Sequence, residues 1–315
     1  MLGKNYLKRI IFIGMPDMAL VCLNKLCAKG INIVGIIPPA KNEPTYNLMI
    51  ETANRLKLNI IEYESKLTEQ DFLSKVKDLD ADLGVVASYN KKLPQELLKL
   101  TKDGFINLHP SKLPDYRGAN PYSHVIINGE EESAITLHFM DEEYDTGDII
   151  SQYRFSIDIN ETMGTLFYRT NEMCASMLFE ALDYYETHQF PRKPQPKKKN
   201  LKKAETLSFE KKNIFINWNK TAEEIERFIR ALNPFIGAIT IYRGYILRIN
   251  SAKVINKKHK YSPGTIIETK KSLKIACGED ILEIESVQYG GFFISSAQDF
   301  IERVNPKKGE ILNNG

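Results

Sequence analysis

Residues 8–108 alternate between short apolar runs and amphipathic segments. The apolar runs are rich in β-branched and aromatic residues and end at glycine, proline or polar positions, as β-strands do. Predicted strands therefore span residues 8–14, 31–37, 83–87 and 104–108, and a further short strand is expected to begin at residues 60–61. Apolar residues at helical spacing predict helices over 18–28, 46–56, 69–77 and a short stretch after Pro94. This alternation predicts an α/β fold with a mostly parallel, doubly wound sheet and right-handed crossovers.

The pattern changes in the remainder of the chain. Before residue 190 it predicts a helix over 121–128, strands over 134–140 and 149–157, and a long amphipathic helix over 165–188. After residue 210, short strands separated by polar turns are expected over 214–218, 238–242, 245–250, 264–268, 273–277 and 281–287. Thr221 and Glu224 have capping-box spacing at the start of a helix running to Leu232. The short strands predict a small β-barrel, of which the five-stranded oligonucleotide-binding (OB) type is one common form.

Residues 190–203 separate these two patterns. They read FPRKPQPKKKNLKK, with three prolines and seven lysines or arginines. Such a composition buries little and predicts an extended, semi-rigid linker. A chain of 315 residues also exceeds the usual size of one hydrophobic core. We therefore predict a catalytic domain over 1–189, a basic Pro/Lys linker over 190–206 and a β-barrel domain over 207–315.

The composition is 43% hydrophobic and 26% charged, which is typical of a globular protein. No apolar run is long enough to span a membrane, and the N-terminus passes from a basic lead directly into a strand, so we expect no membrane span and a cytoplasmic location. The cysteines form no C-x-x-C pair; they are Cys22, Cys27, Cys174 and Cys277. Neither a disulfide framework nor a zinc site is supported, and buried free thiols are expected.

Polar residues gather between the strands in residues 104–148. Asn107 and His109 are two positions apart at the end of a predicted strand, so their side chains leave the same face. Pro110 ends that strand at the carboxyl edge of the sheet, where open α/β sheets bind ligands. An amide N–H beside an imidazolium can stabilise the oxyanion of a tetrahedral intermediate. Asp145, in the loop after 134–140, can orient the imidazole and favour its charged form.

Each of these residues also has a purely structural interpretation. A histidine before a proline is more often a strand-end residue bonded to the backbone, and Asp-Thr-Gly-Asp at 145–148 can be simply a turn. The combination of Asn107, His109 and Asp145 favours catalysis over these separate explanations.

The same stretch is similar to the active-site region of the 10-formyltetrahydrofolate-dependent formyltransferases. That family has Asn-x-His, then Ser-x-Leu-Pro-x-Tyr/Trp-Arg-Gly, then Asp-Thr-Gly-Asp, matched here in order and spacing by 107–109 (NLH), 111–118 (SKLPDYRG) and 145–148 (DTGD). Further segments extend the resemblance over nearly the whole chain. They are the turn 14–17 (GMPD), the segment 85–94 (VVASYNKKLP), similar to the one that lines the pterin pocket, and 216–254, similar to the C-terminal barrel domain.

The resemblance implies a formyltransferase-type Rossmann-like domain followed by an OB-like barrel, with 10-formyltetrahydrofolate as co-substrate and no metal. It implies Asn107, His109 and Asp145 as the catalytic trio. The residues implied for folate binding are Val86, Ser88, Tyr89, Leu93, Ser111, Leu113, Pro114, Asp141 and Asp148. The residues implied for acceptor binding are Met15, Pro16, Asp17, Arg117, Lys197, Lys198 and Lys199.

The implied reaction is attack by a neutral primary amine on the formyl carbon of the folate. Asn107 and protonated His109 would hold the developing oxyanion. Asp145 would keep His109 charged and accept the proton of the amine, directly or through water.

Two acceptors are compatible with this chemistry, the methionyl amino group of initiator tRNA and the amino group of a nucleotide-linked sugar. The lysine-rich segment 192–203 beside a barrel favours tRNA, although such a run can be only a solvated linker. The tRNA branch usually carries a long basic insertion after the second strand, whereas 38–44 (PPAKNEP) is short and weakly basic. Residues 120–122 and 233–238 also resemble the sugar-modifying branch. We expect tRNA, narrowly, on the two-domain layout and the basic linker, and a monomer or weak dimer.

Other classes of protein fit less well. A dinucleotide-dependent oxidoreductase needs a glycine-rich turn after the first strand, but residues 14–19 offer one glycine where three are expected. A non-catalytic RNA-binding protein would explain the basic segment and the barrel. It would not explain the combination of Asn107, His109 and Asp145.

Overall fold

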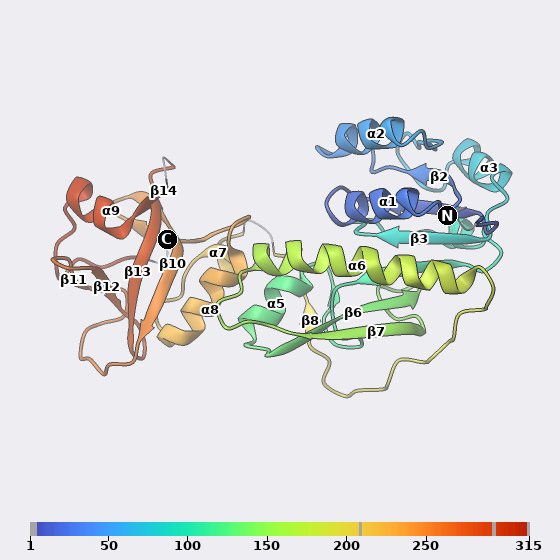
Figure 1. Ribbon diagram of the computed structural model, residues 1–315. Helices are drawn as coiled ribbons and strands as arrows, with labels where there is room; N and C mark the ends of the chain where they lie inside the picture. Colours follow the sequence, from blue (N-terminus) through green and yellow to red (C-terminus); the bar gives the residue numbers. More distant parts are fainter. Residues whose placement is uncertain (1–4, 208–209, 292–293, 314–315) are drawn as a thin grey trace. The chain divides into compact units, whose positions relative to one another are not determined.

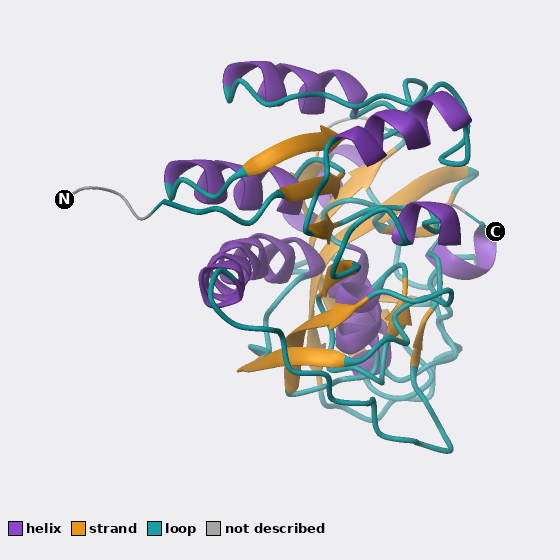
Figure 2. Ribbon diagram, turned by 90° about the vertical axis from the view of Figure 1, so that its right-hand side faces the viewer, coloured by secondary structure: helices purple, strands orange, loops and turns teal. Residues whose placement is uncertain are grey.

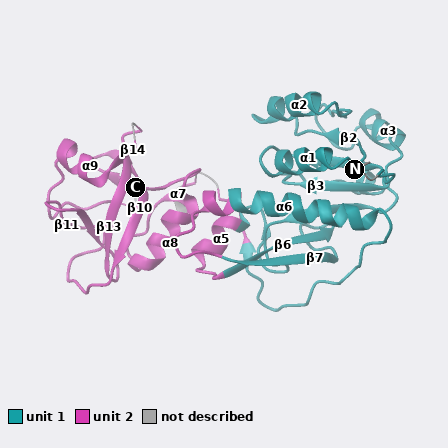
Figure 3. Cartoon of the chain, in the orientation of Figure 1, with its two compact units in different colours: residues 1–121, 132–156, 168–203 teal, residues 122–131, 157–167, 204–315 magenta. Residues whose placement is uncertain are grey.

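The structure is a computed structural model that describes residues 5–207, 210–291 and 294–313. The chain forms two compact units, drawn in different colours in Figure 3. Unit 1 comprises residues 1–121, 132–156 and 168–203, and unit 2 comprises 122–131, 157–167 and 204–315. The domain boundaries expected from composition remain a prediction beside this division.

Unit 1 is built on a six-stranded sheet with the order β2-β1-β3-β4-β6-β7. Four parallel strands form most of it, β1 (Ile10–Gly14), β2 (Ile33–Ile37), β3 (Leu83–Ala87) and β4 (Phe105–His109). At one edge, β6 (Glu132–Phe139) runs antiparallel to β4, and β7 (Ile149–Ser156) runs antiparallel to β6. The prediction of a mostly parallel sheet is confirmed. The prediction that a short strand begins at 60–61 is wrong, because the apolar run is too short for a ladder and Ile60 makes an isolated bridge to Ile36.

Helices lie on both sides of this sheet (Figures 1 and 2). One face is covered by α1 (Met18–Ala28), α2 (Tyr46–Arg55) and α6 (Met163–Tyr185), and the other by α3 (Gln70–Asp78) and α4 (Gln95–Leu98). Alternate residues of β1 explain both contacts: Ile10 and Phe12 join the first core, and Ile11 and Ile13 join the second. A strand buried on both faces must be apolar throughout, as the sequence of β1 is.

Unit 2 contains a curled antiparallel sheet with the order β11-β12-β13-β10-β9. Its strands are β9 (Ala238–Tyr242), β10 (Tyr245–Ile255), β11 (Ile266–Glu268), β12 (Leu273–Ala276) and β13 (Ile281–Tyr289), with β14 (Ile294–Ser296) beside β13. The C-terminal tail bridges both ends of the sheet, since Asn313 pairs with Ile241 and Ile311 pairs with Thr265. The prediction of a small β-barrel after the α/β sheet is confirmed in the form of this half-barrel.

Of the helices of unit 2, α8 (Ala222–Leu232) was predicted from the sequence, whereas α7 (Lys211–Ile214) and α9 (Ala297–Val304) were not. α8 begins with the predicted capping box, in which Glu224 N–H donates to Thr221 Oγ1 at 3.1 Å. A strand was expected over 214–218, but α7 ends there and only Phe215 makes a bridge, to Ile239.

The remaining elements are short. α5 spans Pro121–Ile127, and β5 (Arg117–Gly118) pairs with β8 (Lys203–Ala204). The four cysteines are free, and all except the half-buried Cys27 are buried. Within the described ranges, no helix combines the length and apolar character that crossing a bilayer requires.

Candidate active site

The carboxyl ends of β1, β3 and β4 meet at one edge of the sheet of unit 1. Gly14 is in register with Ala87, and Ala87 is in register with Leu108. Met15 N–H donates to the carbonyl of Ser88 at 2.7 Å, which joins the turn after β1 to the loop after β3. This is the edge at which open α/β sheets bind their ligands.

A row of polar side chains crosses the sheet at that edge. In the β4–β6 ladder, Asn107 is opposite His138 and His109 is opposite Thr136. Facing residues of paired strands project from the same side of a sheet, so these four side chains share one face. Gln152 of β7 extends the row, because it is opposite Thr136 and donates to Thr136 Oγ1 at 2.9 Å.

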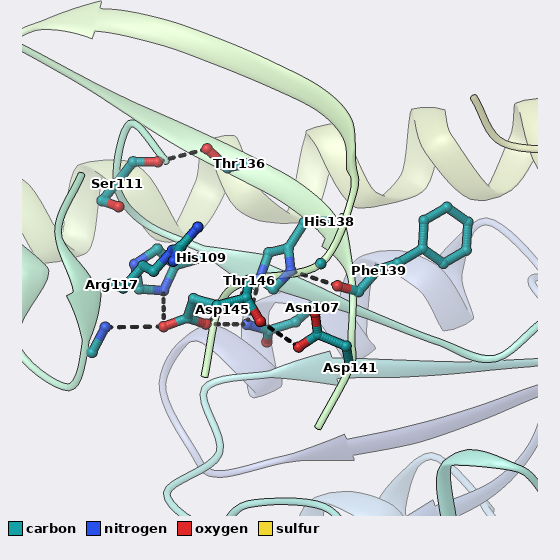
Figure 4. A network of polar contacts seen from close by, with 12 residues as sticks. Asn107, His109, Ser111, Arg117, Thr136, His138, Phe139, Asp141, Asp145 and Thr146 are labelled. Atoms are coloured by element: carbon teal, nitrogen blue, oxygen red, sulfur yellow. Dashed lines mark hydrogen bonds and ion pairs between the residues drawn. The ribbon is translucent and has the colours of Figure 1, made fainter. Parts of the chain in front are cut away.

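Asp145, from the loop between β6 and β7, faces this row (Figure 4). Its Oδ1 atom lies 3.4 Å from Asn107 Nδ2 and 3.6 Å from His138 Nε2. Its Oδ2 atom lies 3.5 Å from His109 Nδ1 and accepts the Gly118 N–H at 3.0 Å. The structure thus brings Asn107, His109 and Asp145 together around one carboxylate.

Two features of the loop sequence explain how Asp145 reaches this place. A Cβ atom at Gly147 would lie 1.9 Å from the carbonyl oxygen of Phe139, so only glycine permits the loop to pack against the end of β6. Asp145 has a φ of 57°, a left-handed conformation that aspartate tolerates better than most residues. Thr146 Oγ1 donates to Asp141 Oδ1 at 2.5 Å within the same loop.

His109 is buried and its two ring nitrogens have different partners. Nε2 donates to the carbonyl of Tyr116 at 2.8 Å, which fixes the ring. Burial is the largest influence on the ring and lowers the pKa of His109 below its ordinary value, although the charge of Asp145 opposes this shift. In the free protein at neutral pH, His109 is therefore mainly a neutral imidazole with Nδ1 toward Asp145.

Asp145 stays ionised in spite of its burial. Burial alone would raise the pKa of its carboxyl, but interactions with His109 and His138 and the hydrogen bond from Gly118 outweigh that effect and hold the pKa well below its usual range. A carboxylate in this state orients a neighbouring imidazole and stabilises its charged form.

The structure adds His138 to the residues expected from the sequence. Its side chain is 2% exposed, its Nδ1 donates to the carbonyl of Phe139 at 2.7 Å, and its Nε2 lies 3.2 Å from Asn107 Nδ2. A signal was present in the sequence, since Thr136 and His138 are polar residues two positions apart within an apolar strand, as Asn107 and His109 are.

The residues expected to bind folate lie around the same edge. Val86 is in register with Asn107. Val86 and Leu93 belong to the apolar cluster on that face of the sheet, and Tyr89 packs against the cluster. Ser111 is buried, and its hydroxyl donates to the carbonyl of Asp115 at 2.9 Å. The others are placed as follows: Ser88 just after β3, Leu113 and Pro114 buried in the 111–118 loop, and Asp141 and Asp148 at the two ends of the Asp145 loop.

The residues expected to bind the acceptor fall into two groups. Met15, Pro16 and Asp17 form the turn after β1, and Arg117 lies beside His109 in Figure 4. Lys197, Lys198 and Lys199 are exposed in the segment after α6, and Lys198 makes an ion pair with Asp115 at 2.5 Å. Among the described residues, no group of three or more His, Cys, Asp or Glu side chains is arranged to hold a metal ion.

Comparisons with known proteins agree with this geometry. Residues 9–182 match the family described as "Formyl transferase", and residues 209–305 match "Formyl transferase, C-terminal domain". A methionyl-tRNA formyltransferase from Clostridioides difficile (strain 630) is 34% identical over 293 residues, which are 89% of this chain and 92% of that protein. One from Orientia tsutsugamushi (strain Boryong) is 34% identical over 299 residues, 93% of this chain and 96% of that protein.

Solved structures share the fold. An N-formyltransferase from Helicobacter canadensis, in complex with folinic acid and dTDP-3-aminofucose, is 20% identical with a TM-score of 0.66, over 88% of this chain and 99% of that one. At that identity the likeness concerns the fold alone. The matches over both units show that the chain belongs to the formyl transferase family, whose enzymes use 10-formyltetrahydrofolate, as the motifs of residues 104–148 predict.

Proposed function

We propose that this formyltransferase transfers the formyl group of 10-formyltetrahydrofolate to the methionyl amino group of initiator tRNA. The observation that carries the proposal is the 34% identity to proteins named methionyl-tRNA formyltransferase across 89% and 93% of the chain, which includes most of unit 2. A relative that resembled only unit 1 would share the formyl transfer without an argument for the acceptor. A cytoplasmic location, where initiator tRNA is charged and used, is part of the same proposal.

We assign stabilisation of the oxyanion to Asn107 and to the imidazolium that His109 becomes when it takes the amine proton. The bond from His109 Nε2 to Tyr116 leaves Nδ1 as the nitrogen that can serve a substrate. Asn107 Nδ2 lies 3.4 Å from Asp145 Oδ1 and 3.2 Å from His138 Nε2, and donating to a substrate oxygen would replace one of these long contacts. Hydrogen bonds of this kind are often long in the free enzyme and shorten when the substrate is bound.

The protonation states modify the role expected for Asp145. A carboxylate whose pKa is far below its usual range is a weak base, whereas neutral His109 is a stronger one. We therefore assign removal of the amine proton to His109 Nδ1, and stabilisation of the resulting imidazolium to Asp145. As the new C–N bond forms and the bond to the folate nitrogen breaks, the imidazolium returns one proton to the leaving nitrogen, so protons balance over the cycle.

The edge beside Asn107 suits the pterin ring of the donor. Val86 and Leu93 are buried apolar side chains on the same face, and the phenol of Tyr89 is bonded to Tyr63 at 2.8 Å. Pockets for flat heteroaromatic rings combine such apolar walls with a few fixed polar groups. Val86, Leu93 and Tyr89 would hold the ring, and Asn107 and His109 would meet the formyl group.

A nucleotide-linked amino sugar is the second candidate acceptor. The observation that favours it is the short segment 38–44 after β2, which carries one lysine and one glutamate instead of a long basic insertion. The solved N-formyltransferase in complex with dTDP-3-aminofucose shares the fold and nearly its whole length with this chain.

A product assay decides between the acceptors. The protein is incubated with 10-formyltetrahydrofolate and either methionyl initiator tRNA or a thymidine-diphosphate amino sugar, and the formylated products are identified by mass spectrometry. We expect formyl-methionyl-tRNA. Binding to initiator tRNA, measured by filter retention, should also weaken steeply as salt increases, because lysine–phosphate contacts release counterions. A formylated sugar with no binding of tRNA at low salt would overturn the tRNA assignment.

A further inference from the structure

Residues 190–203, here called the basic strap, lie along the catalytic loops of unit 1 and contact them. The guanidinium of Arg192 lies 3.5 Å from the ring centroid of Phe139, and the backbone of Lys193 exchanges hydrogen bonds of 2.8 and 3.1 Å with Ile149. Farther along, Tyr116 N–H donates to the carbonyl of Lys202 at 2.6 Å. The strap therefore contacts both β6–β7 and the 111–118 loop.

Gln195 is the residue of the strap that touches both catalytic loops with one side chain. Its Nε2 donates to two backbone carbonyls of the Asp145 loop, those of Asp145 and Gly147, each at 2.8 Å. Its Oε1 accepts from Arg117 Nη2 at 2.7 Å. The side-chain amide is thus fully used, with both N–H groups and the oxygen engaged.

The contacts of Gln195 fall on the strained parts of the site. Asp145 and Tyr116, the neighbour of Arg117, both have a left-handed backbone, with φ values of 57° and 62°. Such conformations cost energy and persist only where surrounding contacts hold them. Two hydrogen bonds to the Asp145 loop provide such contacts, and they fix the carboxylate that faces His109.

The sequence around Gln195 favours this geometry. Pro194 and Pro196 flank it, so its own backbone is biased towards an extended conformation and the φ of each neighbour is fixed. A pre-organised backbone loses less entropy when the side chain is ordered. A neutral amide is also required, since two carbonyls need a donor and Arg117 needs an acceptor.

We propose that Gln195 is a positioning residue, which holds the Asp145 loop and Arg117 at the distances that formyl transfer requires. Gln195 has no contact with the reacting groups and acts through Asp145 and Arg117. The inference rests on the proposed catalytic role of Asp145. It gives the basic strap a function in catalysis besides any contact between its lysines and an acceptor.

Two substitutions separate the contacts of Gln195. Gln195→Ala removes all three hydrogen bonds. Gln195→Glu keeps the shape and an acceptor for Arg117, but offers no donor and brings a negative charge to the carbonyls of Asp145 and Gly147. Gln298→Ala is the matched control, since the Gln298 side chain of α9 bonds Glu302 on the surface of unit 2, at 2.9 Å.

We expect Gln195→Ala and Gln195→Glu to lower kcat by about tenfold to a hundredfold, because displacing a catalytic group by about 1 Å has effects of that size. KM for the folate should stay near the wild-type value, and Gln298→Ala should leave both constants unchanged. Wild-type kcat in Gln195→Glu would show that the donor to the loop is not needed. A change in KM alone, or no change in either variant, would overturn the proposal.

A second measurement does not depend on turnover. Hydrogen–deuterium exchange of residues 141–148 and of the Gly118 amide should be faster in both Gln195 variants than in the wild type or in Gln298→Ala, at unchanged thermal unfolding temperature. Unaltered exchange would overturn the positioning role. If the wild-type protein formylated neither proposed acceptor, the proposed function would fail while the exchange experiment still tested Gln195.

Discussion

The two units use buried polar groups in opposite ways. In unit 1, the histidines at 109 and 138 are buried side by side, and both approach the carboxylate of Asp145. In unit 2, His259 is half-buried and its Nε2 bonds a single backbone carbonyl, that of Asp280, at 2.8 Å. The core of unit 2 is instead apolar, around Trp218 and the strands of the half-barrel.

The clustering of buried ionisable groups indicates which unit carries the chemistry. Burying several ionisable groups together costs stability unless each finds a partner, and such groups have perturbed pKa values. Unit 1 retains this cost at one edge of its sheet, whereas the core of unit 2 around Trp218 is an apolar cluster. Five predictions test the comparison, in order from the largest expected effect to the smallest.

Removing an oxyanion donor should have the largest effect. Asn107→Ala and His109→Ala are each expected to lower single-turnover formyl transfer by about a hundredfold or more, the usual result of deleting such a donor. His259→Ala in unit 2 is the matched control and should retain wild-type turnover. Near-normal transfer in Asn107→Ala and His109→Ala would remove the catalytic assignment.

Two glycine substitutions compare a position that has no room for a side chain, Gly147, with one that has room but a left-handed backbone, Gly244. In Gly147→Ala, the new Cβ would meet the Phe139 carbonyl at 1.9 Å, so the loop must move and Asp145 with it. We expect kcat to fall by roughly tenfold to a hundredfold. Gly244→Ala in the β9–β10 turn has nothing within 4 Å and a φ of 82°, so it should cost only about 1–2 kcal/mol of stability and leave kcat intact. Equal loss of kcat in the two variants would break the comparison.

The pH dependence tests the charge interaction at the site. Asp145→Asn removes the negative charge that raises the pKa of His109, so that pKa, followed by NMR of the ring, should fall further below its ordinary value. If neutral His109 is the base, kcat/KM rises as the pH passes through the pKa of His109. In Asp145→Asn, this rising part of the pH profile should move to lower pH. A pKa that rose in this variant would contradict the assignment.

The same shifts predict how stability depends on pH. The folded pKa of His109 is below the unfolded value of about 6.5, so the unfolded chain binds more protons as pH falls. Its contribution to stability is present above that value and is lost as pH falls towards the folded pKa. Asp145 loses its contribution in a lower window, below about 4. In urea unfolding, His109→Asn should therefore lose less stability than the wild type between about pH 7 and 5.

The smallest effect concerns a helix cap of unit 2. Thr221→Ala deletes the hydroxyl that caps α8 and should cost about 1 kcal/mol in unfolding free energy, with kcat unchanged. Lys220→Ala, which removes only an exposed pair with Glu224 at 3.4 Å, should cost less than about 0.5 kcal/mol. A loss of turnover in Thr221→Ala without unfolding would assign unit 2 a direct part in catalysis.

Much of the fold could be predicted because local patterns agree with it. The bounds of α1 and β3 match their apolar periodicity, and the cap of α8 follows from Thr221 and Glu224 alone. Failures occurred where a short apolar run made a single bridge to the neighbouring strand, as at Ile60, or where a helix ended close to a predicted strand, as at Phe215. In both cases tertiary pairing, which the local sequence does not encode, decided the outcome.

By itself, the sequence determined the types of chemical group and their spacing along each segment. Asn107 and His109 share a face because strands have a period of two, and the motif that holds Asp145 identified the family. Only the tertiary structure decided which segments meet. His138 lies opposite Asn107 because β6 pairs with β4, and Gln195 reaches the Asp145 loop because the strap runs along it. The burial that lowers the pKa of His109 likewise comes from segments distant in sequence, so no local pattern could reveal it.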